Sequence, residues 1–149
     1  MLLLIRVAAV VFVALSMGAS FAHVLELPAK LDLPGDRYLA VQGIYRNFGA
    51  VGAVLETGSL VLMLGALVLG WRHASSPPLF VAALVFFAGS LVTWVVVVSP
   101  MNAAFASWVR DLPVHWTGTR DRWEWGHVAV FGQKLVAFVL LITALLRSR

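Results

Sequence analysis

The residues best suited to chemistry lie where the last apolar stretch of the chain begins. Asp121 and Glu124 have the spacing of a capping box, which predicts a helix that starts near Asp121 and runs to about Leu146. On that helix Glu124, His127 and Lys134 lie at offsets of 0, 3 and 10 residues and share one face. Ionisable residues inside a membrane helix are rare and usually functional, so this face is a candidate site.

The first two apolar segments carry polar residues of the same kind. Ser16, Ser20 and His23 lie at offsets of 0, 4 and 7 residues and form a stripe that ends at an imidazole. Pro28 predicts that this first helix ends near Leu27. In the second segment, Glu56 is a carboxylate within an apolar run.

His23, His127 and Glu56 offer two imidazoles and one carboxylate. That set suits a redox metal such as iron or copper with open coordination positions. Without a metal, one His could act as a base toward an acidic organic substrate, with Glu56 or Lys134 tuning its protonation. Two His on different helices could also hold a haem.

A structural ion pair is a further interpretation of Glu56. Counted from Phe48 and from Gly126, Glu56 and Lys134 each lie 8 residues into their segments, which is roughly 12 Å below the surface. Equal depth allows the two side chains to pair and offset the burial of both charges.

Most of the remaining polar candidates lie toward the same end of the bundle, which favours a pocket roofed by the connections. Tryptophans could stack there on a planar ring; they are Trp108, Trp116, Trp123 and Trp125. The expected catalytic residues are His23, Glu56, Asn102, Trp123 and His127. The expected substrate-binding residues are Gln42, Tyr45, Trp108, Trp116, Arg122, Glu124 and Lys134. Gly49 and Gly52 allow a close approach, by a ligand or, in the interpretation we favour, by a neighbouring helix.

The composition and hydropathy of the chain predict the helices that must position these residues. The chain has 149 residues, of which 61% are hydrophobic and 12% charged, against about 25% charged in soluble proteins. Four segments can cross a bilayer: 2–22, 48–71, 79–99 and 127–146. We expect an all-α, up-down-up-down bundle in one domain, with two longer connections on one face. Pro100 should break the third helix, and residues 103–120 should include a short interfacial helix.

Other features limit the function classes. The chain has no cysteine, which excludes disulfides and thiolate chemistry. Its net charge of +4 is scattered, so we expect no nucleic-acid partner. We expect the first segment to be retained as a membrane helix rather than cleaved, in a bacterial inner membrane with both termini cytoplasmic. The expected partners are the lipid bilayer and a small hydrophobic substrate, and the oligomeric state, a homo-oligomer included, stays open.

The motifs resemble the anthrone oxygenase-like family of small four-helix membrane proteins. They are His23 with 25–28 (Leu-Glu-Leu-Pro), Gln42 with Tyr45, Glu56, Pro100 with Asn102, and 122–124 (Arg-Trp-Glu) with His127. The resemblance implies oxygen-dependent conversion of an anthrone-type aromatic to a quinone, with His23, Asn102, Trp123 and His127 carried over. We therefore expect a membrane-embedded oxygenase. The alternative is a non-enzymatic membrane protein that binds a lipid headgroup or a partner subunit at the same polar end.

Overall fold

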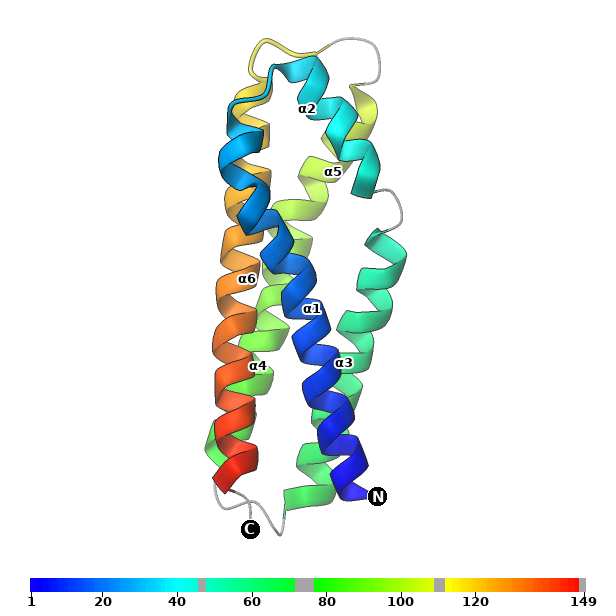
Figure 1. Cartoon of the computed structure of the whole chain (residues 1–149), viewed down its shortest axis with the longest axis vertical. Coiled ribbons are helices and arrows are strands. Elements are labelled where there is room, and N and C mark those ends of the chain that lie inside the picture. The colour runs from blue at the N-terminus through cyan, green and yellow to red at the C-terminus, as the bar shows by residue number, and fades with distance from the viewer. Residues whose placement is uncertain (46–47, 72–76, 109–111, 148–149) are drawn as a thin grey trace.

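The computed structural model of the chain is all-α and describes residues 1–45, 48–71, 77–108 and 112–147. Figure 1 shows a long bundle of helices that run along one axis. In chain order the elements are α1 (Leu2–Leu31), α2 (Gly35–Gln42), the 3₁₀ turn η1 (Gly43–Tyr45), α3 (Phe48–Gly70), α4 (Pro77–Thr93), the π-helical segment η3 (Trp94–Val98), α5 (Ser99–Ser107) and α6 (Trp116–Arg147).

Among the described residues, four stretches are long and apolar enough to cross a membrane: Leu2–Leu31, Phe48–Gly70, Pro77–Ser107 and Trp116–Arg147. Both termini lie at one end of the bundle and α2 lies at the other, as an up-down-up-down bundle requires (Figure 1). This confirms the predicted fold class. Which side of a membrane the termini face stays a prediction.

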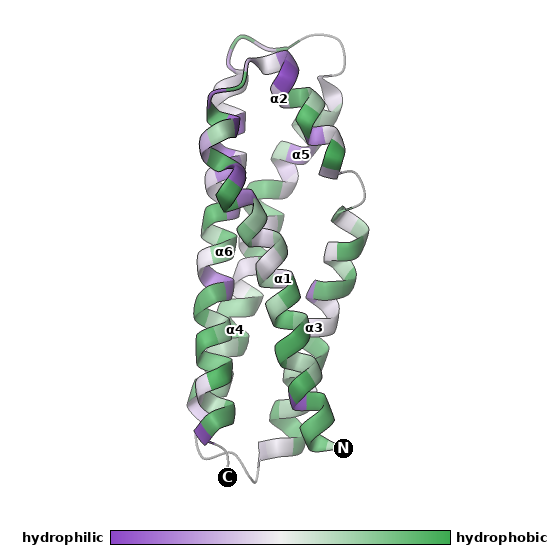
Figure 2. Cartoon of the chain, in the orientation of Figure 1, coloured by the Kyte–Doolittle hydropathy of each residue, from purple (hydrophilic) through white to green (hydrophobic). Residues whose placement is uncertain are grey.

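The apolar core occupies the half of the bundle that carries the termini. Buried residues from all four long stretches pack there, among them Val13, Met63, Phe87 and Leu141. Small residues such as Ala9 and Ala137 let the helices approach closely. Figure 2 shows hydrophilic residues gathered toward the end that carries α2. The two halves of the bundle therefore differ in chemistry.

The end of α1 differs from the prediction. We expected Pro28 to end the helix near Leu27, but α1 continues through Pro28 to Leu31. Proline removes one backbone hydrogen bond, which membrane helices tolerate when neighbours satisfy the freed groups. Here Arg120 Nη1 donates to the Leu31 carbonyl at 2.8 Å, so α6 caps the end of α1. The extra turn carries Lys30 into the bundle, where it is buried.

The third stretch also continues past its proline. We expected Pro100 to break the helix, but the chain makes one π-helical segment, η3, and goes on as α5 to Ser107. A π-turn inserts one extra residue into the helix, and Pro100 stands in the first turn of α5, where its missing N–H leaves no intrahelical bond unmade. Asn102 is therefore on a helix rather than in a loop.

The connection between the third and fourth spans was also predicted wrongly. We expected an interfacial helix within 103–120 and a helix start at Asp121, but α5 takes the first part of that range and α6 begins at Trp116. The earlier start fits the packing of Trp116, whose ring lies 5.7 Å from that of Tyr38 on α2. Arg120 lies over the same indole, 5.1 Å from its centroid.

The contact between α6 and η3 gives a stability prediction. A Cβ at Gly126 would lie 2.9 Å from Val98 Cγ2 and 3.1 Å from Val97 Cγ1. Gly126→Ala should therefore lower the free energy of unfolding by about 1–3 kcal/mol through overpacking. Gly132→Ala is the matched control, because its Cβ would meet no described atom within 4 Å. Thermal unfolding in detergent checks this, and equal midpoints for the two variants would show that the contact is not tight.

Candidate functional site

The site arises because α1 crosses the bundle at an angle. Near the termini α1 packs tightly on α3, since a Cβ at Gly58 would lie 2.4 Å from the Phe12 ring and one at Gly70 would lie 3.1 Å from the Arg6 guanidinium. Toward α2 the helices separate, and a Cβ at Gly49 or Gly52 would meet no described atom within 4 Å. The interpretation that Gly49 and Gly52 serve helix packing is therefore wrong.

A cavity of about 1310 Å³ lies between the separated helices. Its wall includes residues of all four long stretches and of α2, which lies at this end of the bundle (Figure 1). Nine of the expected site residues line it: His23, Gln42, Tyr45, Glu56, Asn102, Trp108, Trp123, His127 and Lys134. The structure thus brings most of the predicted set into one space.

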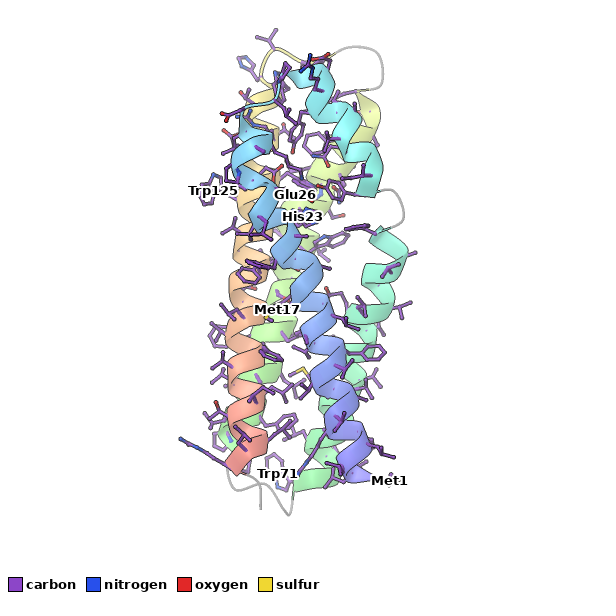
Figure 3. All side chains as sticks on the ribbon, viewed as in Figure 1. Met1, Met17, His23, Glu26, Trp71 and Trp125 are labelled. Carbon is purple, nitrogen blue, oxygen red and sulfur yellow. The ribbon has the colours of Figure 1, made fainter. Side chains whose placement is uncertain are left out.

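Two imidazoles from opposite ends of the sequence meet in the cavity wall. The rings of His23 on α1 and His127 on α6 have centroids 4.1 Å apart. Trp123 lies against both, at 4.1 Å from His127 and 5.1 Å from His23. Tyr45 lies 4.8 Å from His23. Figure 3 shows His23 on the stretch of α1 near α2. His23 and His127 therefore pack directly against each other and both line the cavity.

Hydrogen bonds orient this group. His127 Nδ1 lies 3.0 Å from the Trp123 carbonyl oxygen. A carbonyl can only accept, so Nδ1 carries the proton and Nε2 of the neutral ring keeps its lone pair. The Trp123 indole N–H donates to Asn102 Oδ1 at 2.6 Å. α5 therefore fixes the indole, and the backbone of α6 fixes the tautomer of His127.

A second polar group lies deeper, among Glu56, Lys134, Ser16 and Ser20. Lys134 Nζ forms an ion pair with Glu56 Oε1 and donates to Ser20 Oγ at 2.9 Å. Ser16 Oγ donates to the same Glu56 oxygen at 2.9 Å. The predicted pairing of Glu56 with Lys134 is confirmed, and the serine stripe of α1 supplies its hydrogen bonds.

The metal hypothesis requires His23, His127 and Glu56 to converge. The two imidazoles do meet, but Glu56 Oε1 is bound by Lys134 and Ser16. Within the described ranges, no three His, Asp or Glu side chains are grouped so that they could hold a metal ion. The structure therefore does not assemble the predicted ligand set. Binding of iron, copper or haem stays a prediction.

A charged cluster of Lys30, Glu26, Glu124, Tyr38 and Tyr45 lies beside the imidazoles. Lys30 Nζ lies 3.2 Å from Glu26 and 3.5 Å from Glu124, so one ammonium serves two carboxylates. Each carboxylate also accepts from a phenol: Tyr38 OH donates to Glu124 at 3.0 Å, and Tyr45 OH donates to Glu26. Burial and the carboxylate beside each phenol raise the pKa of Tyr38 and of Tyr45 above the ordinary value. Both phenols therefore remain donors.

Lys30 and Tyr38 belong to this end of the bundle although neither was among the expected site residues. Lys30 Nζ lies over two rings of the site, 4.4 Å from the Tyr45 centroid and 4.6 Å from the Trp123 centroid. The signal was present in the spacing, since Lys30 lies 14 residues after Ser16 and on the same helical face as His23. The predicted helix end near Leu27 placed Lys30 outside the first helix, so this spacing was not considered.

Four predicted aromatic or charged residues lie elsewhere. Glu124 is buried, but in the charged cluster rather than in the cavity wall. Trp116 packs on Tyr38, and Arg122 and Trp125 are exposed on α6. Trp116, Arg122 and Glu124 are therefore not in the described lining of the cavity.

Three buried polar atoms of cavity-lining residues have no hydrogen-bond partner among the described residues: His23 Nδ1, Gln42 Nε2 and Glu56 Oε2. His23 is only 7% exposed, and the Glu26 carboxylate oxygen 3.9 Å from Nδ1 is too distant for a hydrogen bond. Buried polar atoms normally find partners, so these three indicate a ligand or water in the cavity.

Comparison of the chain with protein-family models, with curated proteins and with solved structures finds no match.

The deep ion pair gives a second stability prediction. Lys134→Met leaves the Glu56 carboxylate without its ammonium partner and should lower the free energy of unfolding by about 3–5 kcal/mol. The double variant Glu56→Gln with Lys134→Met should recover most of that loss, because no charge is left unpaired. Urea or thermal unfolding in detergent measures both. Equal destabilisation of the single and double variants would contradict the interpretation as an ion pair.

Proposed function

We propose that the cavity binds a small hydrophobic aromatic molecule of the anthrone type and that the two histidines promote its oxidation by O₂ to a quinone. The observation that carries the proposal is the imidazole pair in the cavity wall, with His127 Nε2 free to accept a proton. Aromatic side chains surround the pair, and polar atoms without partners adjoin it. The family resemblance of the sequence supports the same chemistry.

The reaction balances with O₂ as the only co-reactant. His127 Nε2 removes a proton from the ring methylene, which the adjoining ketone acidifies. The carbanion gives its electron pair to O₂, a C–O bond forms, and the imidazolium returns the proton to the distal oxygen. Removal of the second methylene hydrogen as a proton then breaks the O–O bond and releases water. In sum, one methylene and one O₂ give one carbonyl and one water.

The other residues have positioning roles in this proposal. Asn102 holds the Trp123 indole, and that indole lies against His127. His23 packs on His127 from the opposite helix and presents a second ring nitrogen to the cavity. Lys30, over the Trp123 ring, contributes positive charge near the place where the carbanion would form.

The test uses His127→Ala in protein reconstituted into lipid, with 1,8-dihydroxyanthrone as substrate. Loss of the base should lower the rate at least about a hundredfold. His115→Ala is the matched control, because His115 is exposed and outside the described cavity lining. Oxygen uptake and quinone absorbance are followed together, above the autoxidation measured in empty vesicles.

Three results would contradict the proposal. They are wild-type turnover equal to that of empty vesicles, retained turnover in His127→Ala, and oxygen uptake without quinone. A phospholipid that copurifies with the protein while no oxygen is consumed would favour the alternative of a non-enzymatic protein that binds a lipid headgroup.

A further inference from the structure

The cavity wall continues onto the surface that faces lipid. Val95 of η3 is 58% exposed and Phe48 of α3 is 47% exposed, and both also line the cavity. Both residues belong to stretches long and apolar enough to span a bilayer. Part of that exposed area faces the cavity itself, so the two residues mark an open, apolar wall between α3 and η3, and the spans place this wall at the bilayer.

Glycines keep this side of the cavity open. Gly49 and Gly52 both line the cavity and lie on α3 one turn apart. A Cβ at either position would meet no described atom within 4 Å, whereas one at Gly58, further along α3, would lie 2.4 Å from the Phe12 ring. α3 therefore packs closely on α1 around Gly58, whereas around Gly49 and Gly52 it exposes its backbone to the cavity.

The cavity is also larger than one ring system needs. Its volume is about 1310 Å³, whereas pockets for drug-sized ligands measure about 300–1,000 Å³. His23 Nδ1 and Glu56 Oε2, both buried and without a described hydrogen-bond partner, point to a polar ligand group inside it. The space therefore combines a polar interior with an apolar side that adjoins lipid.

We propose that the cavity takes its aromatic ligand sideways from the bilayer, between α3 and η3, and that this ligand class includes rings bearing a long apolar chain that remains in lipid. The inference deepens the proposed function by naming the substrate class of that site. A chain that stays in lipid neither gains nor loses contact with apolar surroundings when the ring binds, because lipid tails are as apolar as the helix surface.

The test compares two probes of one ring type, methyl-1,4-benzoquinone and decyl-1,4-benzoquinone, in vesicles. Saturable quenching of tryptophan fluorescence measures binding, since Trp94, Trp108 and Trp123 line the cavity. At equal mole fraction in lipid, the two probes should bind within about threefold of each other. If decyl-1,4-benzoquinone bound at least tenfold more weakly than methyl-1,4-benzoquinone, the site would be closed to lipid and the inference would be overturned.

A variant tests the route. Gly52→Leu fills the open space on α3 and should weaken binding of decyl-1,4-benzoquinone at least tenfold without lowering the unfolding midpoint. Gly132→Leu is the matched control, because it lies outside the described lining and its Cβ likewise meets no described atom within 4 Å. Unchanged binding in Gly52→Leu would overturn the route. If the protein bound decyl-1,4-benzoquinone but did not turn over 1,8-dihydroxyanthrone, only the proposed oxidation would be contradicted. If it turned over 1,8-dihydroxyanthrone but did not bind decyl-1,4-benzoquinone, only this inference would be contradicted.

Discussion

A polar side chain inside a bilayer has no water to bond with, so it must find its partner on another helix. This constraint organises the half of the bundle nearest α2. Lys134 on α6 meets Glu56 on α3, and serines of α1 complete the group. Closer to α2, one ammonium from α1 serves carboxylates on α1 and α6. Each polar group ties helices that are distant in sequence and thereby fixes the walls of the space between them.

The crossing of α1 decides where that space lies. α1 packs on α3 near the termini, where Phe12 fills the position beside Gly58, and it joins α6 near α2 through Lys30 and Glu124. A straight helix that changes partner along its length must leave one neighbour uncovered. The uncovered part is the start of α3, which is why the cavity that the two histidines line forms there. The histidines lie beside it because His23 is on the stretch of α1 that has turned toward α6.

Much of this could be predicted from sequence because the dominant forces are local in the chain. Hydropathy gave four spans, and counting residues from the span ends placed Glu56 and Lys134 at one depth, where they do pair. The helix ends could not be predicted so well. Pro28 and Pro100 disfavour a continuous helix by themselves, but the Arg120 cap on Leu31 and the π-turn at η3 offset that preference, and both depend on tertiary packing. Lys30 was overlooked for this reason.

The metal hypothesis shows that suitable residue types do not ensure a suitable arrangement of those residues. His23, His127 and Glu56 have suitable donor atoms, yet the Glu56 carboxylate forms an ion pair with Lys134. Without that pair, the Lys134 ammonium would be buried with no opposite charge. Because the ion pair occupies Glu56 Oε1, the imidazoles are left with each other, with Trp123 and with the open cavity. The same pairing that stabilises the interior thus holds Glu56 Oε1 away from the imidazoles, and both rings line the cavity without that oxygen as a partner.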